Sequence, residues 1–419
     1  MTDREFALDV VRKLQQAGFT ALWAGGCVRD ELLGLVPADY DIATSARPEQ
    51  LRPLFKRRNE IGASFGVVQV LGPRGDDGEW LTVEVATFRS DGTYTDGRRP
   101  DTIVFSSPEE DAKRRDFTIN GMFFDPVSEK LTDFVGGRAD LDAKILRAIG
   151  NPAERFTEDK LRILRAVRMA TRFGLSIDID TFNAARRMAG EIRVVSPERI
   201  AEEFRKLLAH PNRGRGVELF SEFELVEPIL PELSAVGEAW ERTVRAVHAL
   251  GERSSFPLAF AALLHTLDRP TVENIADRLR LSNTEKTRIA FLVEKQEYLA
   301  DAPRLRLSHL KTILVHPGIG ELLALHRALA LAGGKSLEGV EFCERTLREM
   351  PPEELNPPLV LTGEDLIALG LTPGPEFKRL LDAVRSAQLE GQATTKPQAI
   401  ALVQSLRSAA PPASETPPA

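Results

Sequence analysis

The chain has 419 residues, of which 42% are hydrophobic and 28% are charged. This composition is typical of a folded protein, and it excludes a miniprotein, a collagen-like repeat and a wholly disordered chain. At about 100 to 200 residues per domain, we expect two to four domains. The formal net charge of −7 would by itself argue against nucleic-acid binding, because phosphate backbones attract positive surfaces.

The cysteines and the apolar runs indicate in which cellular compartment the protein works. Cys27 and Cys343 lie far apart and belong to no metal-binding motif, so neither a disulfide framework nor a structural zinc site is indicated. The first ten residues are charged, and apolar runs such as 257–264 are much shorter than the roughly 20 residues of a membrane span. We therefore expect a cytoplasmic protein with no membrane partner.

Charge and structural signals both change along the chain. Five short apolar or β-branched runs, separated by Gly, Pro and Asp, predict strands in the first 150 residues: 21–24, 41–44, 67–71, 81–88 and 103–105. From Thr157 onward apolar residues recur at helical spacing, and Ser196-Pro197 predicts a helix start with Ser196 as N-cap. Residues 156–215 carry 13 Lys and Arg against 8 Asp and Glu, so a basic segment lies between acidic ones. An α+β fold is expected, with a small mixed sheet followed by an elongated, all-helical remainder.

A glycine pair followed by two aspartates is the strongest chemical signal. Gly25 and Gly26 stand between a predicted strand and a helix, where backbone amides can approach phosphate oxygens. Asp39 and Asp41, expected at alternate positions of a strand, would present two carboxylates on one face, with Glu84 on another strand as a third. Such oxygen ligands suit magnesium. Each feature alone is more often a tight turn or a solvated strand end, but their combination is more specific.

Two further segments contain arginines beside polar acceptors. The first of these segments is Arg114-Arg115-Asp116-Phe117-Thr118-Ile119-Asn120-Gly121. The guanidinium of Arg115 can donate two hydrogen bonds to phosphate oxygens, and Asp116 and Asn120 can form hydrogen bonds with ribose hydroxyls. In the segment 158–168, a helix would project Asp159, Arg162, Arg165 and Arg168 from one face. By itself, such a stripe is usually a solvated, salt-bridged surface.

Together these motifs resemble the nucleotidyltransferase branch that contains the class II tRNA nucleotidyltransferases and the bacterial poly(A) polymerases. The resemblance rests on GGxVRDxLLG and DxDxxT at residues 25–44, RRDFTIN at 114–120 and EDKLRILRAVR at 158–168, with Met169 where the family pattern has Phe. It implies magnesium held by Asp39, Asp41 and Glu84. It also implies a nucleotide site made of Gly25, Gly26, Arg29, Arg115, Asp116, Asn120, Asp159, Arg162, Arg165 and Arg168.

The implied reaction is template-independent addition of CCA to the 3′ end of tRNA from CTP and ATP, with no protein partner required. Two alternatives share the chemistry, an A-adding tRNA nucleotidyltransferase and a poly(A) polymerase, and a non-catalytic RNA-binding protein is a third. The polar segment 88–100 resembles a loop of CCA- and A-adding enzymes, and 61–66 lacks the arginines associated with poly(A) polymerases. These two segments favour a tRNA substrate. RNA binding should be modest and weakened by salt.

The resemblance also implies a domain order. We expect a catalytic head at 1–150, a helical neck at 151–215, a helical body at 216–350, a tRNA-binding tail at 351–408 and a disordered terminus at 409–419. Some relatives carry a metal-dependent phosphohydrolase site in the body, which needs an adjacent His-Asp pair. Here His265 is followed by Thr266, which cannot supply a carboxylate ligand. We therefore expect no phosphohydrolase activity.

Overall fold

The computed structural model describes residues 1–60, 66–75, 78–91, 103–234, 237 and 239–408. Its contacts divide the chain into two compact units, residues 1–235 and 236–419. The finer division into head, neck, body and tail stays a prediction, and the predicted terminal segment 409–419 lies outside the described residues.

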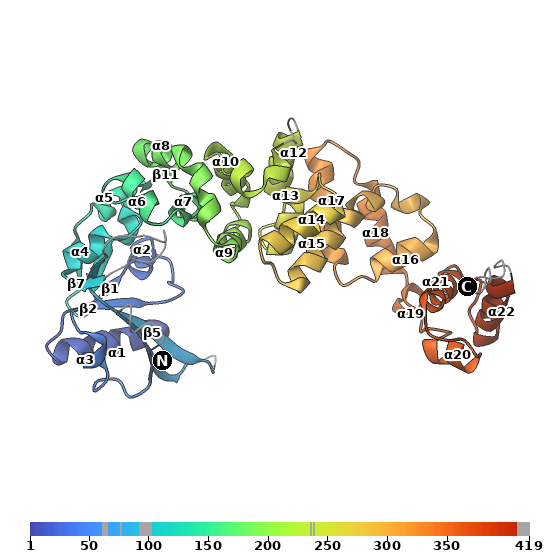
Figure 1. Ribbon diagram of the computed structural model, residues 1–419, viewed down its shortest axis with the longest axis horizontal. Coiled ribbons are helices and arrows are strands. Elements are labelled where there is room, and N and C mark those ends of the chain that lie inside the picture. The colour runs from blue at the N-terminus through green and yellow to red at the C-terminus, as the bar shows by residue number, and fades with distance from the viewer. Residues whose placement is uncertain (61–65, 76–77, 92–102, 235–236, 238, 409–419) are drawn as a thin grey trace, which may run out of the picture. The chain divides into compact units, whose positions relative to one another are not determined.

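The first unit begins with a mixed α/β region and continues as helices (Figure 1). Its elements are α1 Asp3–Gln16, β1 Ala21–Ala24, α2 Gly26–Leu32, β2 Asp41–Thr44, α3 Pro48–Leu51, β3 Arg58–Asn59, β4 Val67–Arg74, β5 Trp80–Thr87, β6 Arg89–Asp91, β7 Ile103–Phe105, α4 Pro108–Lys113, η2 Thr118–Asn120, β8 Met122–Asp125, β9 Lys130–Asp133, α5 Gly137–Asp142, β10 Ile145–Leu146, α6 Pro152–Glu158, α7 Leu161–Phe173, β11 Ser176–Ile177, α8 Ile179–Arg187, η3 Ala189–Val194, α9 Pro197–Leu208, α10 Arg213–Glu222, α11 Val226–Ile229 and η4 Pro231–Leu233.

A seven-stranded mixed sheet organises the start of this unit. Its strand order is β3-β4-β5-β2-β1-β8-β9, and β2 and β5 run parallel while the other neighbours are antiparallel. The register pairs Asp41 with Glu84, so two of the predicted carboxylates stand on adjacent strands. On β5, Val83 and Val85 are buried and Glu84 is exposed, as the alternation of a half-buried strand requires.

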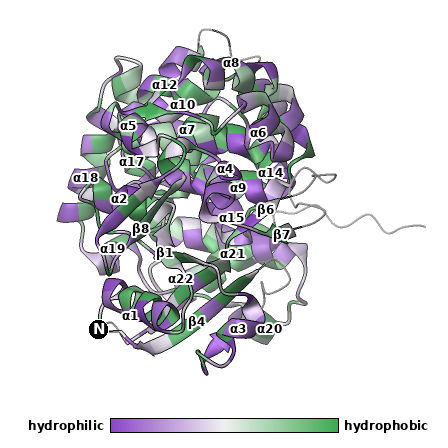
Figure 2. Cartoon of the chain, turned by 90° about the vertical axis from the view of Figure 1, so that its left-hand side faces the viewer, coloured by the Kyte–Doolittle hydropathy of each residue, from purple (hydrophilic) through white to green (hydrophobic). Residues whose placement is uncertain are grey.

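Alternating hydropathy explains how helices cover this sheet. Helix α1 buries Phe6, Val10 and Leu14 and exposes charged residues between them, so hydrophobic and hydrophilic residues adjoin along it in Figure 2. The hydroxyl of Thr2 accepts from the amide of Glu5, and the carboxylate of Glu5 accepts from the amide of Thr2, so the two residues form a capping box.

The helices α7 and α9 form the core of the region after the sheet. They bury mainly apolar side chains, among them Leu164, Val167 and Phe204. Gly174 ends α7 with a left-handed φ of 62°, the usual conformation of a helix stop. Ser196 occupies the N-cap position of α9 as predicted, but its hydroxyl makes no capping hydrogen bond, so the expected capping interaction is wrong.

The second unit is helical throughout the part that the structure describes (Figure 1). Its elements are α12 Ala239–His248, α13 Phe256–Leu264, α14 Arg269–Arg278, α15 Asn283–Lys295, η5 Gln296–Leu299, η6 Ala302–Arg304, α16 Leu307–Leu314, α17 Ile319–Ala332, α18 Glu338–Glu349, α19 Pro352–Leu355, α20 Gly363–Ala368, α21 Pro375–Leu389 and α22 Lys396–Ser408. Helix α13 is apolar all round and buried except at Pro257, so it is a core helix of this unit. Helices α20 to α22 share a smaller core around Leu366, Leu380 and Val403.

The α+β prediction is confirmed, and five strands, β1, β2, β4, β5 and β7, occupy the predicted places. The sequence patterns missed the strands β3, β6, β8, β9, β10 and β11, which are two to four residues long and show too little alternation to be recognised. None of the described helices is long and apolar enough to cross a membrane.

Candidate active site

The glycine turn lies where β1 enters α2. Gly25 has a φ of 74° and a ψ of −122°, a conformation that side chains with a Cβ rarely adopt. A Cβ at this position would also lie 2.6 Å from Nη1 of Arg115. Gly25 is therefore required twice, by its backbone conformation and by the close approach of an arginine.

The acidic residues meet at the adjoining edge of β2. Asp39 and Asp41 both line one cavity, although Asp39 precedes β2 and does not belong to the strand as predicted. Glu84 does not line this cavity but stands beside Asp41 in the register. The pKa of Asp41 is raised to about 6. The main cause is partial removal of the carboxyl from water, and the negative charges of Asp39 and Glu84 add to it. The side chain of Asp41 nevertheless keeps an exposed edge. Among the described residues, no group of three or more His, Cys, Asp and Glu is arranged to hold a metal ion.

A buried polar network supports the cavity from η2. Asp116 accepts hydrogen bonds from Nη2 of Arg165 at 2.6 Å and from Nδ2 of Asn120 at 3.0 Å. Burial would raise the pKa of Asp116, but the charge of Arg165 and these hydrogen bonds outweigh burial and hold it far below its ordinary value. Arg29 is buried and donates to the side-chain oxygen of Asn120. Asp116 and Asn120 thereby fix the orientation of two arginines that line the cavity.

Arg115 is held from two sides. Its guanidinium pairs with Asp111 at 3.0 Å, and its Nη1 donates to the backbone oxygen of Asn120 at 3.3 Å. Asp111 also pairs with Arg114 at 2.7 Å, and both arginines line the cavity. One buried carboxylate therefore positions two cations that face the same space.

The junction between α6 and α7 differs from the prediction. Asp159 is not on the helix with Arg162; it follows α6 in an extended conformation and accepts from the amide of Leu161 at 3.1 Å. A single continuous helical face is therefore wrong for Asp159, because the chain breaks between the two helices. The side chain of Arg162 pairs with Glu158 at 2.6 Å, and its link to Asp159 is a backbone hydrogen bond of 3.0 Å; both Asp159 and Arg162 line the cavity.

Arg168 also has a role that the motif does not show. It is buried and forms an ion pair with Glu203 of α9 at 2.5 Å, while one edge still lines the cavity. The same Glu203 lies 3.8 Å from Arg165. Helices α7 and α9 are thus joined by a charged contact next to the site.

Sequence reasoning missed three arginines of the cavity, Arg114, Arg172 and Arg199. Arg199 contacts both carboxylate oxygens of Asp159, at 2.7 and 3.2 Å. The pattern Ser-Pro-Glu-Arg showed only that a helix begins near Arg199, and it could not show that α9 directs this side chain toward Asp159. Arg172 lies one turn after Arg168 on α7, so continuing the arginine spacing would have found it.

All these groups meet in one cavity of about 590 Å³ in the first unit. Of the predicted residues only Glu84 is outside its lining; the others present are Gly25, Gly26, Arg29, Asp39, Asp41, Arg115, Asp116, Asn120, Asp159, Arg162, Arg165 and Arg168. Four carboxylates, of Asp39, Asp41, Asp116 and Asp159, therefore line a space that is also rich in arginine, a combination that suits a metal-bound triphosphate.

Comparison with known proteins agrees with this geometry. Residues 21–147 match the model of the poly A polymerase head domain, and residues 174–236 match that of a probable RNA- and SrmB-binding site of polymerase A. The CCA-adding enzyme of Streptococcus mutans is 36% identical over 94% of this chain and 95% of its own. The chain belongs to the CCA-adding enzyme family.

Further members of the family give the same result. The CCA-adding enzyme of Enterococcus faecalis is 33% identical over 94% of both chains. The crystal structure of the Bacillus stearothermophilus CCA-adding enzyme in complex with CTP has a TM-score of 0.76 at 28% identity and covers 97% of this chain and 98% of that one. The predicted family and the classification as a nucleotidyltransferase are confirmed.

Members of this enzyme class generally use a divalent metal. The segments 61–65 and 92–100, which carried the arguments about tRNA against poly(A), lie outside the described residues.

Proposed function

We propose that this chain completes the CCA end of tRNA, adding C, C and A from CTP and ATP without a nucleic-acid template. The observation that supports this most strongly is the joint lining of one cavity by Asp39 and Asp41, which suit a cation, and by Asp159 and Arg162, which suit the edge of a base. The reaction is in-line attack of the RNA 3′-hydroxyl on the α-phosphorus, with pyrophosphate as leaving group.

Magnesium is the cation that the carboxylates fit best. A common magnesium set consists of one or two carboxylates completed by waters and substrate phosphates, and Asp39 and Asp41 supply two. Removal from water, and after it the charges of Asp39 and Glu84, raise the pKa of Asp41; a cation would offset the charge that Asp39 and Glu84 contribute. When bound, magnesium promotes ionisation of the attacking hydroxyl and neutralises the triphosphate.

The arginines of the cavity orient the triphosphate and the sugar. Arg29 and Arg115 would bind phosphate oxygens, and each is already fixed by contacts with Asn120, so little conformational entropy is lost on binding. Asp116 would accept from a ribose hydroxyl while it keeps Arg165 in place.

Base recognition would come from the junction of α6 and α7. The carboxylate of Asp159 has about four acceptor positions, and Arg199 with the Leu161 amide fills three, which leaves capacity for an amino group of cytosine or adenine. Arg162 would donate to a ring nitrogen or carbonyl oxygen of the base. These amino groups are common to cytosine and adenine and absent from uracil, so the same residues could accept CTP and ATP in turn.

Pyrophosphate release tests this function against a non-catalytic RNA-binding role. We expect release when CTP is added to tRNA that ends at the discriminator base, and when ATP is added to tRNA that ends in CC, with none from tRNA that already ends in CCA. Chelation of magnesium should abolish release in both cases. Absence of release with every tRNA would favour the binding role, and release only from the CC-ended tRNA would favour an A-adding enzyme.

A cytoplasmic location suits this function. Both cysteines are free and buried, as expected in a reducing compartment, and tRNA maturation supplies the substrate there.

A further inference from the structure

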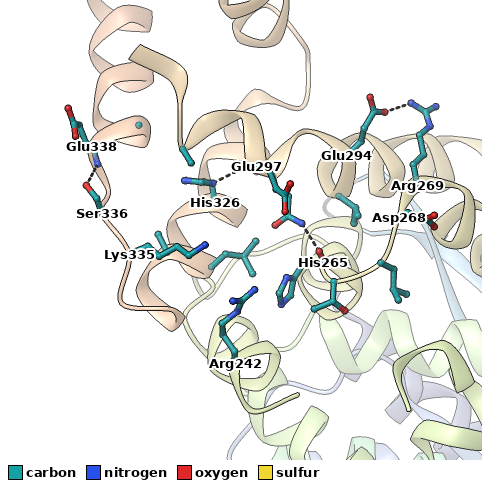
Figure 3. Close-up of a pocket in the computed structure, with 18 residues that line it drawn as sticks. Arg242, His265, Asp268, Arg269, Glu294, Glu297, His326, Lys335, Ser336 and Glu338 are labelled. Carbon is teal, nitrogen blue, oxygen red and sulfur yellow. Dashed lines mark hydrogen bonds and ion pairs between the residues drawn. The ribbon is translucent and has the colours of Figure 1, made fainter. Parts of the chain in front are cut away.

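A second cavity, of about 860 Å³, lies in the helical unit and contains none of the residues of the candidate active site. Its walls come from α12, from the turn after α13, and from α14, α15, η5, α17 and α18. Its volume is within the range of small-molecule sites, about 300 to 1,000 Å³. Figure 3 shows that charged and imidazole side chains from several of these helices face this space.

Two cations share one end of the cavity. A Cβ placed on Gly333 would lie 3.7 Å from Cδ of Arg242 and 3.7 Å from Cγ of Lys335, so the stems of both side chains lie next to Gly333. Neither forms an ion pair with any residue that the structure describes. The Nε of Arg242 is buried without a hydrogen-bond partner. Arg242 is half-buried and Lys335 is exposed, so an anion between them would gain charge-assisted hydrogen bonds from both.

Two histidines stand beside these cations. Nε2 of His265 lies 3.2 Å from the hydroxyl of Thr243, and Nδ1 of His326 lies 2.7 Å from the backbone oxygen of Gln296. Gln296 also donates to the backbone oxygen of His265 at 2.6 Å, so one residue contacts the ring of His326 and the backbone of His265. Burial and then the charge of Arg242 lower the pKa of His265 to about 4.

Four acidic residues line the cavity: Asp268 and Glu294 lie at the end away from the cations, and Glu338 lies beside Ser336 on the side of Lys335. Glu294 is paired with Arg269 at 2.5 Å, and Asp268 caps α14 by accepting from Thr271 at 3.0 Å; Figure 3 shows this group at the end away from Lys335 and Arg242. Glu297 lines the middle of the cavity and forms no ion pair with the described residues. The cavity thus offers cations at one end and an exposed acceptor, Glu297, near its middle.

We propose that this cavity binds a small phosphomonoester, with its phosphate between Arg242 and Lys335 and a hydroxyl-bearing remainder toward Glu297. A monoester phosphate carries close to two negative charges and matches the two cations, whereas a backbone phosphodiester of RNA carries one. The planar fork of Arg242 suits two phosphate oxygens. The rings of His265 and His326 line the same cavity and would report on a bound anion.

The test uses the full chain labelled at histidine, with inorganic phosphate as the probe at constant ionic strength. We expect the NMR signals of His265 and His326 to shift with phosphate and to saturate, while the signal of His309, which is not in the cavity lining, stays unchanged. Arg242→Gln should weaken this binding by about ten-fold or more, as expected when charge-assisted hydrogen bonds are lost. Phosphate bound at the active site does not interfere, because the signals followed belong to this cavity.

Two further variants keep the result interpretable. Lys335→Gln changes an exposed side chain, so it should fold normally and still weaken binding. Arg245→Gln, one turn farther along α12 and outside the cavity lining, is the matched control and should bind phosphate like the parent chain. The proposal is wrong if the signals of His265 and His326 do not shift with phosphate, or if Arg242→Gln and Arg245→Gln bind phosphate equally well. It is also wrong if tRNA shifts these signals and phosphate does not.

Discussion

Single residues of the active site carry both conformation and chemistry, and Gly25 shows this most clearly. Gly25→Ala should lose about 1 to 3 kcal/mol of stability, because alanine is strained at its φ and ψ, and should weaken nucleotide binding because Arg115 must move. Gly18→Ala is the control, since Gly18 also has a positive φ but its Cβ would meet nothing within 4 Å. Urea unfolding and the KM for CTP separate the two effects. Equal KM values in both variants would contradict the role given to Arg115.

Asp39 tests the proposed magnesium site. Asp39→Asn removes a negative charge but keeps the shape, and Asp39 is exposed, so stability should change little. The turnover number should fall by about 100-fold or more, since a metal-held charge is worth several kcal/mol in the transition state. Nucleotide incorporation is the measurement, with the exposed Asp142→Asn as control. Undiminished incorporation by Asp39→Asn would refute the metal assignment.

At the scale of elements, the contact between α7 and α9 lies next to the junction of α6 and α7, for which we propose base recognition. Glu203→Gln leaves the charge of the buried Arg168 without its partner, so the chain should lose about 3 kcal/mol or more of stability. Glu202→Gln is the matched control, because Glu202 is exposed and its pairs with Arg205 and Lys206 are worth less than about 1 kcal/mol. Urea unfolding of both variants gives the comparison. Similar losses would mean that the buried pair does not stabilise the packing of α7 on α9.

The sequence predicted the elements that carry motifs better than the way they pack. The strand with Asp41 and the turn at Gly25 have local signatures, namely β-branched runs and glycine pairs, and both could be located. The break at Asp159 could not, because the arginine spacing continues through it and only the extended conformation of one residue interrupts the helix. Arg199 is 40 residues from Asp159, so their contact depends on tertiary packing that no local pattern encodes.

At the scale of the whole molecule, the acidic net charge proves a poor guide to function. The basic segment 156–215 supplies five arginines to the cavity, so local charge serves a polyanionic substrate although the total is −7. The candidate active site lies in the first unit, and the second unit has its own buried core and its own cavity.

The second unit should be sensitive to acid through His265. The pKa of His265 is about 4 in the folded chain and about 6.5 when unfolded, so between these values the unfolded state binds more protons and stability falls as the pH is lowered. Above pH 6.5 His265 contributes no pH dependence. Relative to His265→Gln, the parent chain should lose about 2 kcal/mol between pH 7.5 and pH 5. Urea unfolding in phosphate-free buffer gives the free energy of unfolding at each pH. The same pH dependence of this free energy in the parent chain and in His265→Gln would contradict the prediction.

The most direct test of the proposed function is the sequence of the products. A tRNA that ends at the discriminator base is incubated with the enzyme, magnesium, CTP and ATP, and its 3′ ends are then sequenced. The cavity that joins Asp39 and Asp41 to Asp159 and Arg162 predicts ends that read CCA and stop there. Long A tracts, or extension only of tRNA that already ends in CC, would contradict the account.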